Sequence, residues 1–172
     1  TENKNMKNAR YIILVLAVVV VALVGLMKTK NNISVTNPVD LTTDFCYIWN
    51  TESGDSASLK VTINDEDQTN ISGSLNILPA EKDKKTGIFV GTVTPVDPVS
   101  VTRTATLMWS SSAEGIANTE ELFIIFGEGI ASVGFGEMKD RGDGVYIYAD
   151  PKAISYTFNL QQTDCNDLAL KY

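Results

Sequence analysis

From Phe45 onward, apolar residues alternate with polar ones along short segments that are separated by turn-forming residues. In a typical segment Leu59, Val61 and Ile63 fall on one side of an extended chain, and the polar residues between them fall on the other. A two-residue repeat predicts strands with one buried face, and regular turns between such strands favour an antiparallel sandwich or barrel. No segment in this region shows a sustained helical repeat. We therefore expect an all-β domain over residues 45–172.

The alternation predicts about nine strands that follow one another through short turns. They cover Cys46–Asn50, Ser58–Ile63, Ile71–Ile77, Gly87–Thr94, Val101–Ser110, Glu121–Phe126, Gly129–Met138, Val145–Ala149 and Ile154–Leu160. Strands joined by consecutive hairpins suit an up-and-down barrel, which has no free edge. Glycines inside the strands, such as Gly73 and Gly91, fit the bends that a closed barrel needs. We predict a small antiparallel up-and-down β-barrel, with a β-sandwich as the alternative.

An uninterrupted apolar run, Tyr11–Met27, precedes this domain and contains no charged residue. As a helix it would span about 26 Å, slightly less than the ~30 Å apolar core of a bilayer. Flanking basic side chains can extend to the membrane surface and make up the difference. The run ends in Gly25-Leu-Met-Lys, without the small-residue cleavage site of a secretory signal. We predict an uncleaved transmembrane helix that acts as a signal anchor.

The anchor divides the chain into four predicted parts. These are a basic tail over residues 1–10, the transmembrane helix over 11–27, a linker over 28–44 and the β domain over 45–172. The basic tail favours a cytoplasmic N-terminus, whereas Lys28 and Lys30 favour the opposite orientation. The absence of a second apolar span and the cysteine pair favour an external β domain. We expect a single-pass protein of the cytoplasmic membrane with an extracytoplasmic C-terminal domain.

The chain beyond the anchor is acidic and contains no histidine. From Lys28 onward there are 11 basic and 20 acidic residues. Without a basic surface to replace phosphate counterions, nucleic acid is not an expected partner. The absence of histidine excludes Ser-His-Asp and Cys-His nucleophile arrangements and the usual zinc sites. We expect no enzyme activity, no metal and no cofactor.

The only two cysteines, Cys46 and Cys165, lie near the two ends of the β domain. In an exported protein they can close a disulfide around nearly the whole domain. Two buried free thiols are the alternative. We expect the disulfide, on the condition that the domain is exported.

Three strand residues are candidate ligand contacts. Arg103 is in phase with Leu107 and Trp109, so the alternation predicts that its side chain points into the barrel. A buried guanidinium needs a partner, which can be a ligand or a carboxylate of the chain. We predict ligand contacts at Arg103, Trp109 and Trp49, with a structural ion pair as the alternative for Arg103. Most of the remaining strand aromatics are expected in the core: Tyr47, Phe89, Phe123, Phe126, Phe135, Tyr146, Tyr148, Tyr156 and Phe158.

Several short motifs resemble a family of small bacterial envelope proteins, many of which are lipoproteins. The motifs are Cys46-Tyr47, Gly73-Ser-Leu75, Glu81-Lys-Asp83, Gly87-Ile-Phe89-Val-Gly91, Ser112-Ala-Glu-Gly115 and Gly134-Phe-Gly-Glu137. The resemblance covers residues 46–150 and implies a lipocalin-like β-barrel with no established activity. The chain departs from the lipoprotein pattern at its N-terminus, where an apolar helix stands in place of the acylated cysteine.

These features predict a membrane-anchored extracytoplasmic β-barrel that acts as a binding or interaction module of the cell envelope. Its expected partners are the bilayer, through Tyr11–Met27, and another envelope protein or a small apolar ligand. One alternative is a pilin-like or filament subunit that packs through its apolar helix, although Pro38 disfavours the long helical stem of a pilin. A second alternative is an envelope enzyme or inhibitor that uses acidic residues such as Glu120 and Glu121.

Overall fold

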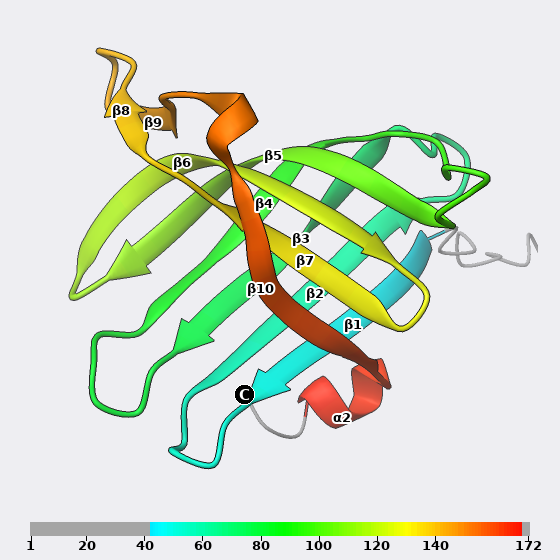
Figure 1. The fold of residues 1–172 in the computed structure, drawn as a ribbon, viewed down its shortest axis with the longest axis horizontal. Coiled ribbons are helices and arrows are strands. Elements are labelled where there is room, and N and C mark those ends of the chain that lie inside the picture. Colours follow the sequence, from blue (N-terminus) through cyan, green and yellow to red (C-terminus); the bar gives the residue numbers. More distant parts are fainter. Residues whose placement is uncertain (1–41, 170–172) are drawn as a thin grey trace, which may run out of the picture. The chain divides into compact units, whose positions relative to one another are not determined.

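The protein forms an antiparallel β-barrel closed by eight strands in a computed structural model that describes residues 42–169 (Figure 1). In chain order the elements are β1 (Thr42–Asn50), β2 (Ser56–Asn64), β3 (Asn70–Leu78), β4 (Lys85–Val93), β5 (Thr102–Ala113), β6 (Ile116–Gly127), β7 (Ile130–Phe135), β8 (Met138–Asp140), β9 (Val145–Tyr148), the 3-10 helix η1 (Pro151–Ala153), β10 (Ser155–Thr163) and α2 (Cys165–Ala169). Pairing between β5 and β6 closes the ring. The predicted all-β barrel is confirmed, and the sandwich alternative is wrong.

Strands β1 to β7 pair with their neighbours in the chain as successive hairpins. The chain then leaves the ring as the short β8–β9 hairpin, at the upper left of Figure 1, where β9 pairs in parallel with β6 at Thr119 and Glu120. It returns as β10, which lies between β7 and β1 and completes the barrel. The ring therefore has up-and-down order, except that β8 and β9 lie outside it between β7 and β10.

Some details differ from the sequence prediction. The predicted strand Gly129–Met138 is divided into β7 and β8, because the chain leaves the barrel after Phe135. Helix α2 was not predicted, since five residues are too short to show a helical repeat. Strand β1 begins at Thr42, within the segment predicted as a linker.

The N-terminal predictions fall on a part of the chain that the structure does not cover. The basic tail, the predicted transmembrane helix Tyr11–Met27 and most of the linker lie outside the described residues. Within residues 42–169, no helix has the length and apolar character that crossing a bilayer requires.

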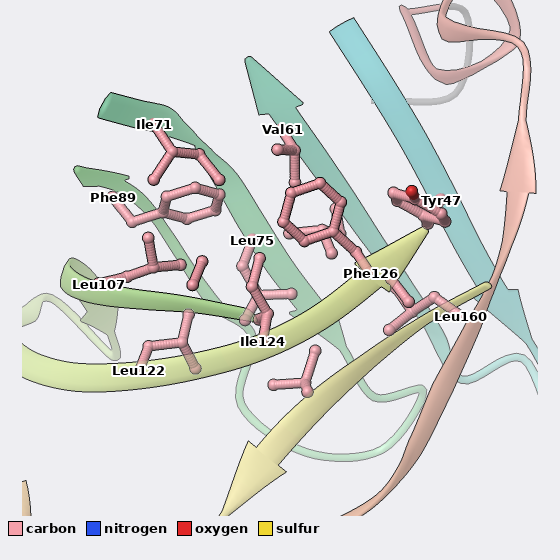
Figure 2. Packing of buried hydrophobic residues seen from close by; sticks show 14 of the residues in the cluster. Tyr47, Val61, Ile71, Leu75, Phe89, Leu107, Leu122, Ile124, Phe126 and Leu160 are labelled. Carbon is pink, nitrogen blue, oxygen red and sulfur yellow. The ribbon is translucent and has the colours of Figure 1, made fainter. Parts of the chain in front are cut away.

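The interior of the barrel is a packed core. Figure 2 shows Val61, Leu75, Phe89 and Ile124 pointing into a common interior from four different strands. The buried cluster comprises Tyr47, Ala57, Leu59, Val61, Ile63, Ile71, Leu75, Phe89, Val93, Ala105, Leu107, Trp109, Leu122, Ile124, Phe126, Ala131, Val133 and Leu160. Burial of this apolar surface is the main stabilising contribution to the fold. These side chains come from every strand of the ring, so the packed core holds the whole wall together.

One glycine is required by this packing. A Cβ atom at Gly73 would lie 2.0 Å from the carbonyl oxygen of Lys60 and 2.6 Å from the ring of Phe89. Real Cβ atoms do not approach other atoms so closely, so any side chain here would displace the neighbouring strand or the ring. Gly73 therefore allows the backbone of β2 and the Phe89 ring of β4 to lie close to β3.

Candidate functional site

The candidate site lies where β1 and β10 separate. The ladder between these strands is short and joins Cys46, Tyr47 and Ile48 to Thr163, Gln162 and Gln161. Beyond Ile48, β1 continues to pair with β2 but no longer pairs with β10. The β10–β7 ladder also changes register between Ser155 and Phe158. Few backbone hydrogen bonds therefore join the two sides of the wall next to the β1–β2 and β3–β4 hairpins.

Aromatic side chains line a pocket at this separation. The rings of Trp49 and Phe158 meet edge to face, with centroids 5.1 Å apart, and Phe135 meets Phe158 in the same manner at 5.7 Å. The pocket has a volume of about 390 Å³ and is lined by Trp49, Asp55, Ser56, Ile77, Pro79, Phe135 and Phe158. Phe135 is 45% exposed, so the pocket is open to solvent. Small-ligand sites are commonly of this size and occur at the mouths of β-barrels.

Asp55 places a carboxylate at the pocket and holds two hairpins together. Its Oδ1 accepts the backbone N–H of Ala80 at 2.9 Å, and its Oδ2 accepts the hydroxyl of Ser53 at 2.9 Å. These hydrogen bonds, first the one from Ala80 and then the one from Ser53, lower the pKa of Asp55 below its usual value. The carboxylate is therefore ionised at neutral pH and fixed in position. None of the residues that line the pocket is Lys or Arg.

The second tryptophan, Trp109, lies in a different environment. Its side chain is 3% exposed, and the Nζ of Lys85 lies over its ring, 4.8 Å from the centroid. Lys85 also forms an ion pair with Glu120, at 2.6 Å between Nζ and Oε1. The hydroxyl of Ser111 donates to the same carboxylate at 3.1 Å. The chain thus supplies both the cation over the Trp109 ring, which is Lys85, and the carboxylate that balances its charge, which is Glu120.

Arg103 is the second residue of β5 and is partly exposed, so the buried guanidinium expected from the alternation is not found. Its Nη2 donates to the side-chain oxygen of Gln68 at 3.1 Å, and its Nη1 donates to the Gln68 carbonyl oxygen at 3.4 Å. Among residues 42–169 it forms no ion pair, so the alternative of a structural salt bridge is wrong for the described part of the chain. Arg103 links the start of β5 to the β2–β3 turn.

The structure separates the three predicted ligand contacts. The pocket that Trp49 lines includes neither Trp109 nor Arg103. Their roles in ligand binding stay predictions, and Trp49 is the one of the three that lines this open aromatic pocket. Sequence reasoning placed Phe135 and Phe158 among the aromatics expected in the core and did not single out Asp55. No sequence signal brings together residues from β1, β7, β10 and the β1–β2 turn, because their proximity depends on how the barrel closes.

The predicted disulfide is confirmed. Cys46 of β1 and Cys165 of α2 are bonded, with their Cα atoms 5.2 Å apart. Cys46 is the first residue of the short β1–β10 ladder, and its side chain is 1% exposed. The bond therefore joins β1, at one end of its ladder with β10, to the helix that follows β10.

Metal binding finds no support in this part of the chain. Across residues 42–169, no group of three or more His, Cys, Asp or Glu side chains is arranged to hold a metal ion. Glu120 and Glu121, which an enzyme would use as a carboxylate pair, both make contacts within the fold. Glu120 pairs with Lys85, and Glu121 accepts the backbone N–H of Tyr148 at 3.1 Å.

Comparisons with protein-family models, with curated proteins and with solved structures found no match to this chain. The resemblance to lipocalin-like envelope proteins stays a prediction, and the function is inferred from the site itself.

Proposed function

We propose that this protein is a binding module of the cell envelope, and that it takes a small ligand in the pocket formed by Trp49, Phe135 and Phe158. The observation that carries the proposal is the contrast between a filled barrel interior and an open aromatic pocket at the β1–β10 separation. Exposed aromatic surface is costly in water, and a pocket lined by it gains free energy when a ligand covers it. The module is proposed to bind its ligand without a catalytic step.

The proposed location is outside the cytoplasmic membrane, tethered by Tyr11–Met27. The disulfide between Cys46 and Cys165 supports this location, because such bonds persist in oxidising compartments and are rare in the cytosol. The apolar run and its flanking basic residues support a membrane tether. No observation on the described residues favours the filament or enzyme alternatives over binding.

Ligand binding can be tested by fluorine NMR on the full-length protein in lipid nanodiscs. Because the chain contains two tryptophans, labelling with 5-fluorotryptophan gives two signals, which the Trp49→Phe variant assigns. With a panel of small neutral and cationic compounds, we expect at least one compound to shift the Trp49 signal and leave the Trp109 signal in place. A panel that shifts neither signal at millimolar concentration would overturn the proposal.

A matched pair of substitutions separates the pocket from general destabilisation. Phe158→Leu removes a pocket wall, whereas Phe45→Leu removes a partly buried ring of β1 that does not line the pocket. We expect the first to weaken binding and the second to leave it unchanged.

The proposed location has its own test. Glu128 is exposed in the turn between β6 and β7, and Glu128→Cys adds a thiol there. A membrane-impermeant maleimide should label this variant on intact cells. Labelling only after lysis would place the domain in the cytoplasm and exclude the proposed location.

A further inference from the structure

The geometry of the pocket points to the chemical class of its ligand, and the inference rests on the proposed binding function. Trp49 and Phe135 both stand at steep angles to Phe158, with interplanar angles of 71° and 64°. Phe158 therefore lines the pocket with a ring plane steeply inclined to those of Trp49 and Phe135, which line it too. The face of an aromatic ring carries partial negative charge and attracts cations, and several rings around one space form the cage that binds alkylated ammonium groups.

The electrostatic surroundings also favour a cation. Asp55 contributes a fixed, ionised carboxylate, and no Lys or Arg lines the pocket. Lys82 lies beyond Asp55 in a neighbouring depression and helps to lower the pKa of Asp55, but the two side chains form no salt bridge. The domain as a whole is acidic. A positive ligand is therefore drawn to the pocket by the nearest charge and by the domain.

The environment of Trp109 provides an internal comparison. There the chain itself supplies the cation, because Lys85 lies over the ring and Glu120 balances its charge. Trp49 has an aromatic wall and a carboxylate nearby, but no cation of the described chain lies over it. The pocket at Trp49 therefore has an aromatic ring and a carboxylate, as at Trp109, but no cation of the described residues lies over the ring.

We propose that the pocket binds a quaternary ammonium group. Both oxygens of Asp55 already accept hydrogen bonds, so the pocket offers few acceptors to a primary ammonium, which would lose its hydration on entry. An alkylated ammonium has no N–H to satisfy. A free compound and a lipid headgroup can both carry this group, and the experiment below distinguishes the two sources.

The test compares choline with its neutral isostere 3,3-dimethyl-1-butanol in the same fluorine NMR experiment, using nanodiscs of phosphatidylglycerol. We expect choline to shift the Trp49 signal with an affinity at least tenfold higher than that of the neutral compound. Phe158→Leu should weaken choline binding roughly 2- to 30-fold, the equivalent of one cation–π contact of about 0.5–2 kcal/mol. Asp55→Asn should weaken it roughly 2- to 5-fold without changing the binding of the neutral compound.

A control variant tests whether the loss of choline binding is specific to the carboxylate at the pocket. Asp97→Asn removes another exposed turn carboxylate that accepts backbone N–H groups, and it should leave choline binding unchanged. Equal or tighter binding of the neutral isostere would overturn the cation inference while the binding function stands. If choline, the neutral isostere and every compound of the wider panel fail to shift the Trp49 signal, both the cation inference and the proposed binding function are overturned. A shifted Trp49 signal in phosphatidylcholine nanodiscs without added choline would assign the pocket to a lipid headgroup rather than to a free compound.

Discussion

Trp49 and Trp109 lie on opposite walls of the barrel, and each has a carboxylate nearby, but within residues 42–169 only Trp109 has a cation over its ring. Trp109 is buried, with Lys85 over its ring and Glu120 paired with Lys85, although its indole N–H has no hydrogen-bond partner among the described residues. Trp49 faces the open pocket beside Asp55, where β1 and β10 have separated. At Trp109 the chain supplies the cation, whereas at Trp49 we propose that a ligand supplies it. A partly buried aromatic group that lines an open pocket indicates a candidate site when the described fold does not itself provide its partner.

The first prediction compares the stability contributions of the two tryptophans. Trp109→Ala empties a fully packed position and should lower the free energy of unfolding by about 3–5 kcal/mol. Trp49→Ala should cost about half as much or less, because Trp49 is only partly buried against the core. Urea denaturation with the disulfide intact measures both values. Equal losses would show that Trp49 belongs to the packed core.

The second prediction concerns the disulfide between Cys46 and Cys165. The bond closes a loop with a sequence separation of 119 residues, so replacing both cysteines by alanine should lower the free energy of unfolding by about 2–5 kcal/mol. Because Cys46 starts the short β1–β10 ladder, ligand binding at Trp49 should weaken as well. The Trp109 fluorine signal of the folded variant should keep its position. A change at Trp109 as large as that at Trp49 would contradict this local effect.

The third prediction tests the cation that the chain supplies. Lys85→Met leaves the largely buried Glu120 without its partner and should cost about 1–3 kcal/mol. Lys60→Met breaks the exposed ion pair with Asp44 and should cost less than about 1 kcal/mol. The double variant Lys85→Met with Glu120→Gln should recover part of the loss. Strictly additive costs would show that the pair does not act as a unit.

The smallest effect is expected at Tyr47, the inward-facing residue before Trp49 on β1. Its hydroxyl donates to the carbonyl of Gly127 at 2.8 Å, and burial raises its pKa to about 12. An unfolded tyrosine ionises near pH 10, so the stabilisation from the neutral folded form is complete below about pH 10 and is lost as the pH rises towards 12. Tyr148, whose pKa burial also raises to about 12, adds to this loss.

Tyr47→Phe should therefore cost about 1 kcal/mol at pH 8, through the lost hydrogen bond. Between pH 10 and 12 its free energy of unfolding should fall less steeply than that of the unmodified protein. Urea denaturation at a series of pH values provides the comparison. Parallel curves would show that Tyr47 ionises equally in the folded and unfolded states.

The sequence predicted the barrel because its information is local and repeated. Alternation along Leu59, Val61 and Ile63 identifies an inward face, and short turns dictate which strands are neighbours. The disulfide was also predictable, because only two cysteines exist. The division of Gly129–Met138 into β7 and β8 was not, since an excursion from the ring depends on where β10 returns.

The candidate site could be predicted only in part. Trp49 was predicted as a ligand contact, but the other rings of its pocket, Phe135 and Phe158, have the same local pattern as core aromatics. What distinguishes them is a ladder that ends early and a change of register in β10. Both features arise from tertiary closure of the barrel, and the alternation of apolar and polar residues in the sequence does not reveal them. In the sequence Asp55 is indistinguishable from an ordinary turn residue, because its place at the pocket also depends on how the barrel closes.

The Cys46–Cys165 bond also determines how the domain carries mechanical load. A pull applied to the two ends of the described chain is transmitted directly across the bond, from β1 to α2. The residues between the cysteines are bypassed and cannot be stretched while the bond is intact. Only the short segments outside the cysteines extend under tension. The pocket and the packed core therefore keep their shape under a force that would unravel an uncrosslinked barrel strand by strand.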